Sequence, residues 1–380
     1  MRRVLILAGA IVFVDTMFYG AIAPLLPYYE ARLDLSKSAA GVLAGAYPAG
    51  TVLFALPGGW LSSAVGPRRT AVGGLLVMAA ATLAFGLARN IAVLDLARFL
   101  QGAAGTCMWA GALGWILGEG PREQRGEMIG TALAAAVGGM IVGPVLGGVA
   151  AAASPGIVFG AVAAIATGLA VIATRTPVGA PPGAPPIRDI GRALRTPRVV
   201  GAMWLLVLPS LLAGAVEVLT PLRLSALGAT TTAIGGVFLM ASAAEMVLSR
   251  GVGRFADRRG RFAPIRMALG MVVAILVLLP VPTAPVLLAA LIVAFWGGMA
   301  FFWTPSSALV ADESEAAGLP AEFVPGFSNL AWGGGQAIGS LAGAAIAAAT
   351  ADAVAYGILA GACVATLAVL LARRPGQAPA

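Results

Sequence analysis

The chain has 380 residues, of which 59% are hydrophobic and only 11% are charged, and its formal net charge is +8. Soluble domains carry about 25% charged residues, so this composition excludes that class and predicts an integral membrane protein. Histidine is absent and cysteine occurs twice. These counts argue against histidine relays, His- or thiolate-ligated metal sites and a disulfide framework, and we expect no metal and no cofactor.

Apolar runs separated by short polar turns predict an all-α protein with twelve transmembrane helices, since about 20 apolar residues cross the hydrocarbon core. We expect these spans at residues 4–26, 38–62, 70–88, 92–118, 127–150, 155–174, 198–222, 231–250, 264–280, 284–311, 325–348 and 352–372. The connection 175–197 is rich in proline and arginine, which favours an extended linker. This linker divides the twelve spans into six and six, so we expect two six-helix bundles, over 1–174 and 198–380.

Most of the 24 basic residues fall on the side that holds the central linker and both termini. Basic loops remain in the cytoplasm, so we expect both termini there. We expect the protein in a plasma membrane, and its composition favours a bacterial inner membrane. The net charge then reflects topology, and no nucleic acid partner is expected.

The first predicted span carries Asp15 at its midpoint. A carboxylate at this depth costs about 3 kcal/mol or more, so such residues usually face a wet cavity or a partner. Pro24 and Pro27 follow, where the helix should end or kink. The alternative is a carboxyl that stays protonated or pairs with a neighbouring helix only for packing.

Two similar segments occupy matching places in the two halves, which indicates an internal repeat. The second, GRFADRRGR, begins at Gly253 between spans eight and nine, and the first begins at Gly59 between spans two and three. They resemble the G-x-L-x-D-R-x-G-R-[RK] loop signature of the major facilitator superfamily. The resemblance implies a twelve-helix, pseudo-symmetric major facilitator fold.

In that family the signature aspartate caps a neighbouring helix and pairs with arginine, which closes the cytoplasmic side. Asp257 matches it, whereas Ser63 replaces it in the first copy and can cap only weakly. The implied gate residues are Gly253, Arg254, Asp257, Arg258, Gly260, Arg261, Ser63 and Arg68. A merely basic loop is the alternative.

Arg98, Gln101 and Gly102 on span four resemble the family's R-x-x-Q-G signature, which is associated with proton coupling. An arginine among apolar residues needs a carboxylate or carbonyl partner, and Asp15 and Asp95 are both candidates. Alternatively, Arg98 anchors the span at the outer interface.

Span five contains a segment similar to the G-x-x-x-G-P-x-x-G-G signature of exporter branches. Its residues are Gly139, Gly143, Pro144, Gly147 and Gly148. Such a flat, kinked face lets a helix pack closely, and the match favours export over uptake.

The spacing of Asp15, Pro24 and Pro27 resembles the D-x8-P-x2-P pattern of proton-coupled multidrug, tetracycline and vesicular-amine antiporters. Glu217 lies in a segment similar to their E-P-x-L-P motif, without the proline after the glutamate. Amine-transporting members carry acids where this chain has Ala300 and Asn329, which argues against a small cationic amine.

The resemblance implies a proton-coupled exporter of drugs or small hydrophobic metabolites that works by alternating access and is not an enzyme. Proton coupling is assigned to Asp15, Arg98 and Glu217. Substrate binding is expected at Asp15, Tyr19, Trp109, Glu217, Trp303 and Asn329.

The expected partners are a small-molecule substrate, protons and membrane lipid, and the expected state is a monomer. The alternatives are an exporter or symporter of a sugar or other neutral metabolite, and a non-transporting membrane receptor. Glu245 on span eight either lines the cavity or, as we favour, pairs with Arg250 or Arg254.

Overall fold

The computed structural model describes residues 2–119, 125–176, 196–318 and 324–372. The chain forms two compact units, which we describe separately. Unit 1 comprises Met1–Asp34 and Ala46–Pro185, and unit 2 comprises Leu35–Gly45 and Pro186–Ala380. The linker predicted at 175–197 lies outside the described residues except at its two ends.

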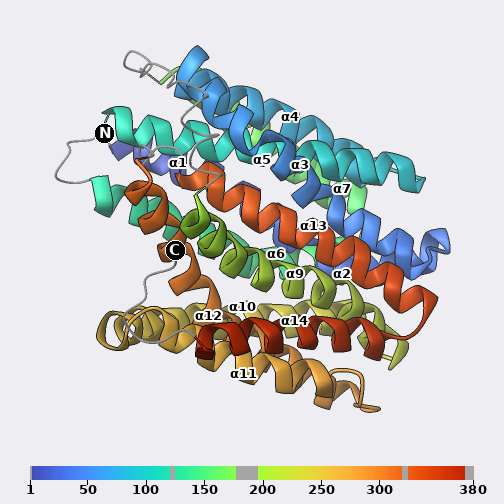
Figure 1. Cartoon of the computed structure of the whole chain (residues 1–380). Coiled ribbons are helices and arrows are strands. Elements are labelled where there is room, and N and C mark those ends of the chain that lie inside the picture. Colours follow the sequence, from blue (N-terminus) through green and yellow to red (C-terminus); the bar gives the residue numbers. More distant parts are fainter. Residues whose placement is uncertain (1, 120–124, 177–195, 319–323, 373–380) are drawn as a thin grey trace. The chain divides into compact units, whose positions relative to one another are not determined.

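Helices account for nearly all of the described part of unit 1 (Figure 1). They are α1 (Arg2–Gly20), α2 (Ile22–Leu33), α3 (Lys37–Val65, from Ala46 onward), α4 (Pro67–Leu87), α5 (Ile91–Glu119), α6 (Arg125–Ala152) and α7 (Pro155–Thr174). α1 packs along α6 and α5, while α4 packs between α5 and α7. Asp15 therefore lies on a helix that is covered by two others.

Unit 2 is built in the same way (Figure 1). Its helices are α9 (Pro197–Ala226), α10 (Thr231–Arg259), α11 (Phe262–Leu278), α12 (Pro285–Ala316), α13 (Val324–Ala349) and α14 (Asp352–Ala372). α9 packs against α13 and α12, α10 against α12, and α11 against α12 and α14. Proline opens α9 and α12, as it opens α4 and α7, because the first turn needs no N–H donor there.

The all-helical membrane architecture predicted from the sequence is confirmed. Within the described residues, nine helices are long and apolar enough to cross a membrane. The count of twelve spans stays a prediction. Most helix bounds lie within a few residues of the predicted ones, and α7 and α14 match them.

The first predicted span, 4–26, is not one helix. It breaks at Ala21 into α1 and α2, and both Pro24 and Pro27 lie inside α2. A proline ring clashes with the carbonyl four residues earlier and removes one helical hydrogen bond. For Pro24 that carbonyl belongs to Gly20, so the break comes one turn before the proline instead of at it.

The repeated motif was expected in loops, and this expectation was wrong for most of its residues. Gly253 to Arg259 form the last turns of α10, and Gly59 to Val65 form the last turns of α3. In each copy the helix ends at a glycine with positive φ, 99° at Gly66 and 78° at Gly260. Only glycine adopts such angles without steric cost, which explains why a glycine follows the helix in both copies.

The first turns of α3 belong to unit 2. Lys37 forms an ion pair with Asp352 at 2.7 Å. A Cβ atom at Gly41 would lie 2.6 Å from the carbonyl oxygen of Ser340 on α13. Small residues thus allow close helix contact here, as they do elsewhere in membrane proteins.

Candidate functional site

Asp15 in the middle of α1 is the centre of a polar cluster inside unit 1. Its side chain is buried, with 3% of its surface exposed. The Tyr47 hydroxyl donates to Oδ1 of Asp15 at 2.6 Å, and the Trp109 indole Nε1 donates to Oδ2 at 2.8 Å. Each carboxyl oxygen therefore has its own donor, one from α3 and one from α5.

Arg98 joins this cluster through Tyr47. Its guanidinium lies over the Tyr47 ring, 4.9 Å from the centroid, in cation–π geometry. Nη1 donates to the Phe18 carbonyl and to Oε1 of Gln101, each at 3.3 Å. Arg98 is 1% exposed, so it does not anchor α5 at the interface as the alternative proposed.

Of the two carboxylates considered as partners of Arg98, the structure favours Asp15. The Arg98 guanidinium lies over the ring of Tyr47, whose hydroxyl donates to Oδ1 of Asp15. Oδ1 of Asp95 has no hydrogen-bond partner among the described residues. The arginine and the carboxylate thus share one tyrosine and form a single network.

The backbone of α5 lies close to the Asp15 side chain at Gly105. A Cβ atom at Gly105 would overlap Oδ1 of Asp15 and would lie 2.7 Å from the Tyr47 hydroxyl. Tyr19 contacts the Tyr47 ring, with the centroids 5.4 Å apart. Among the residues predicted for coupling or substrate binding, the structure therefore brings Asp15, Tyr19, Arg98 and Trp109 together.

Sequence reasoning missed Tyr47 and Gly105. A tyrosine in an apolar span can face lipid or protein equally well, and no local pattern marks the difference. The R-x-x-Q-G resemblance was the only signal close to these residues.

Replacing Tyr47 by phenylalanine should remove the Oδ1 donor and leave the ring beneath Arg98 in place. A hydrogen bond to a charged group contributes about 1.5–3 kcal/mol, so we expect substrate turnover to fall by about 10- to 150-fold. Flux into proteoliposomes measures this. Tyr28→Phe is the matched control, because the Tyr28 hydroxyl accepts from Arg32 at an exposed position; equal effects of the two variants would refute a specific role for Tyr47.

Unit 2 holds a second buried carboxyl at Glu217 on α9. Nε2 of Gln336 on α13 donates to its Oε2 at 2.5 Å, and the two residues are 6% and 1% exposed. Oε1 of Gln336 has no hydrogen-bond partner among the described residues. One turn further along α13, the Ser340 hydroxyl donates to the Gly214 carbonyl at 3.2 Å. Gln336 was not predicted, because nothing in the sequence marks it as the partner of Glu217.

Gln336→Leu should leave that Glu217 oxygen without its amide donor inside the bundle. A buried group that loses its partner costs about 1–3 kcal/mol, so transport should fall by about 5- to 150-fold. Ser340→Ala is the control, because it also removes a hydrogen bond between α13 and α9 without touching Glu217. If both variants lose the same stability and transport, the pair is only a packing contact.

The remaining predicted residues of unit 2 do not join the pair formed by Glu217 and Gln336. Trp303 on α12 and Asn329 on α13 are half-buried, and in the part of the chain that the structure describes neither hydrogen-bonds to Glu217. Glu245 is half-buried on α10. Among the described residues it forms no ion pair with Arg250 or Arg254, so the favoured pairing is not seen.

The glycine motif of α6 faces the helix that carries Asp15. Cβ atoms at Gly139, Gly143 and Gly147 would contact backbone of Phe13, Met17 and Ala21 in turn. Pro144 lies inside α6, and Gly148 is buried. The Thr16 hydroxyl also donates to the Ala136 carbonyl at 2.8 Å. Successive turns of α6 therefore lie directly on α1.

Three of the predicted gate residues make polar contacts within their own units, two of them to distant parts of the sequence. Arg261 pairs with Asp312 of α12 at 2.5 Å. The Ser63 hydroxyl donates to the Gly59 carbonyl of its own helix at 3.2 Å, and Arg68 donates to the Thr176 carbonyl at 2.9 Å.

Asp257 was expected to cap a helix and pair with arginine. It is exposed on α10 and has neither contact among the described residues. Gly253, Arg254 and Arg258 lie on the same last turns of α10.

Comparison with known proteins places these observations in context. A family model described as Major Facilitator Superfamily matches residues 8–321. The fold resembles a D-xylose-proton symporter, with a TM-score of 0.77 over 98% of this chain and 97% of that one, at 14% identity. It also resembles the nucleoside transporter NupG, with a TM-score of 0.76, 13% identity, and 97% and 99% coverage. At these identities the likeness shows the fold alone.

Sequence relatives match over shorter stretches. The MFS-type transporter ppzB of Metarhizium rileyi (strain RCEF 4871) is 30% identical over 127 residues, which is 32% of this chain and 26% of that protein. Quinolone resistance protein NorA of Staphylococcus aureus (strain MRSA252) is 27% identical over 131 residues, which is 34% of each chain. The matches thus span about a quarter to a third of these relatives.

Proposed function

Because the chain belongs to the Major Facilitator Superfamily and is a multi-pass membrane transporter, we propose that it is a proton-coupled exporter of drugs or small hydrophobic metabolites. The observation that carries this proposal is the buried Asp15, held by Tyr47 and Trp109 beside Arg98. Ionisable groups inside a membrane are costly and mark proton or substrate pathways.

In the proposed mechanism Asp15 exchanges a proton for substrate. Tyr47 and Trp109 orient the two carboxyl oxygens when the group is charged. Tyr19 and Trp109 add aromatic surface beside it for an apolar substrate. If substrate binding lowers the affinity for the proton, then by linkage the bound proton lowers the affinity for the substrate by the same factor.

Glu217 serves as a second proton or substrate site in this proposal, with Gln336 as its partner. Trp303 and Asn329 are proposed substrate contacts of unit 2. We place the protein in a plasma membrane with both termini in the cytoplasm, which is the orientation that its basic residues favour.

Export is preferred to uptake because of the α6 glycines and the partial similarity to a quinolone resistance protein. The second candidate is an exporter or symporter of a sugar or other neutral metabolite. Solved sugar and nucleoside transporters share the fold at 14% and 13% identity, which leaves the substrate open.

The test is flux into proteoliposomes of a lipophilic cation, a neutral drug and a sugar, with and without an imposed pH gradient. We expect gradient-driven accumulation of the cation or the drug, abolished by a protonophore. Accumulation of the sugar alone would establish the second candidate. Flux that ignores the gradient would identify a facilitator, and tight binding without flux would indicate a receptor.

A further inference from the structure

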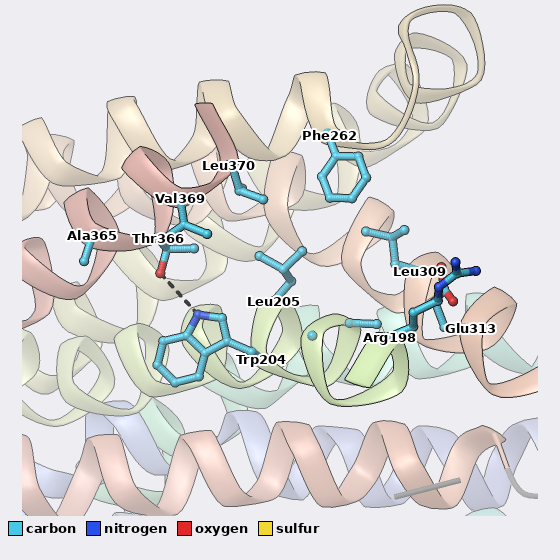
Figure 2. Close-up of a pocket in the computed structure, with 12 residues that line it drawn as sticks. Arg198, Trp204, Leu205, Phe262, Leu309, Glu313, Ala365, Thr366, Val369 and Leu370 are labelled. Atoms are coloured by element: carbon cyan, nitrogen blue, oxygen red, sulfur yellow. Dashed lines mark hydrogen bonds between the residues drawn. The ribbon is translucent and has the colours of Figure 1, made fainter. Parts of the chain in front are cut away.

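Unit 2 contains a cavity of about 230 Å³ that none of the proposed transport residues lines. It lies where α9 and α11 begin and where α12 and α14 end (Figure 2). The four helix ends place it at one end of unit 2. Since helices of this length cross the hydrocarbon core, we expect their ends at the membrane interface.

The inner wall of this cavity is apolar. Leu205 and Leu370 are buried and line it, and Val369 beside them is 52% exposed. The indole of Trp204 is 44% exposed and donates to the Thr366 hydroxyl at 3.2 Å (Figure 2). Tryptophan concentrates at membrane interfaces because its ring is apolar and its N–H is polar. The wall is therefore suited to a hydrocarbon chain that enters from the bilayer.

The other end of the cavity is charged. Arg198 comes from the first turn of α9 and Glu313 from the last turns of α12, and Figure 2 shows both on the same side of the cavity. Neither forms a hydrogen bond or ion pair with another side chain in the described ranges. The cavity thus presents one positive and one negative group next to an apolar wall.

We propose that this cavity binds a phospholipid whose head group carries a primary amine. The lipid phosphate would lie on the Arg198 guanidinium, the ammonium on the Glu313 carboxylate, and one acyl chain along Leu205, Val369 and Leu370. Charge complementarity selects this occupant. Arginine binds phosphate oxygens through several donors, and an ammonium group offers three donors to a carboxylate. An anionic lipid without an amine would offer the Glu313 carboxylate no cationic group.

The site is tested by native mass spectrometry of the full chain with phosphatidylethanolamine or phosphatidylglycerol of the same acyl composition. We expect tighter binding of phosphatidylethanolamine. Arg198→Gln and Glu313→Gln should each weaken it by about fivefold, the upper range for one exposed ion pair. Added phosphatidylethanolamine should also raise the thermal midpoint of the wild type more than that of either variant, because a ligand that binds only the folded state stabilises it.

The matched controls are Arg175→Gln, at the exposed end of α7, and Glu315→Gln, exposed two residues beyond Glu313. Both should bind lipid as the wild type does. Equal losses in control and cavity variants would overturn the proposal. The proposal would also be overturned if phosphatidylglycerol bound more tightly than phosphatidylethanolamine and Glu313→Gln strengthened that binding further. The cavity would then select an anionic lipid. Neither result depends on transport, so the proposed function can fail separately.

Discussion

Asp15→Asn should abolish accumulation driven by a pH gradient and leave exchange of substrate without net proton movement measurable. Asparagine keeps the size of the side chain and can still accept from Tyr47 or Trp109, but it cannot bind and release a proton. Coupling typically changes the affinity for one ligand by a factor of about 5–150 when the other binds. Without a titratable group at this position that factor is lost, so the gradient should no longer drive accumulation. Uptake into proteoliposomes with an imposed gradient, compared with counterflow at equal pH, measures both.

Asp34→Asn is the control for this experiment. Asp34 is exposed at the end of α2 with φ of 51°, a conformation that asparagine also tolerates. It should transport as the wild type does. Full uphill transport by Asp15→Asn would refute the role of Asp15 and return it to packing.

Gly147→Leu should prevent α6 from packing on the junction of α1 and α2. A Cβ atom at this position would overlap the Ala21 carbonyl oxygen and would lie 2.8 Å from Cγ of Pro24. Backbone cannot move aside as a flexible side chain can, so the helices must separate. Overpacking typically costs about 1–3 kcal/mol, and a larger side chain against backbone belongs at the upper end. The thermal midpoint and the monodisperse fraction of the purified protein should both fall.

Gly160→Leu provides the comparison, since a Cβ atom at Gly160 on α7 meets no heavy atom within 4 Å. It should leave the thermal midpoint nearly unchanged. A Gly147→Leu protein as stable as Gly160→Leu would show that the α6 contact with α1 and α2 adapts without cost. The glycine motif would then need another explanation.

The sequence by itself determined the membrane class, the all-helical fold, the superfamily and most helix bounds. It also singled out Asp15 and Arg98, because a charge within an apolar run is costly unless protein surrounds it. The glycines of α6 were identified by their resemblance to the G-x-x-x-G-P-x-x-G-G signature, and their close contact with α1 follows from the absence of a side chain.

The tertiary structure decided which residues meet these groups. Tyr47 and Trp109 are 32 and 94 residues away from Asp15, and Gln336 is 119 residues away from Glu217. In a soluble helix the polar face reveals which side is exposed, but in a membrane the lipid-facing and protein-facing sides are both apolar. Sequence periodicity therefore carries little information about which side chains point inward. For the same reason the sequence did not predict the cavity at Arg198 and Glu313. Its walls come from four helices that only the fold brings together.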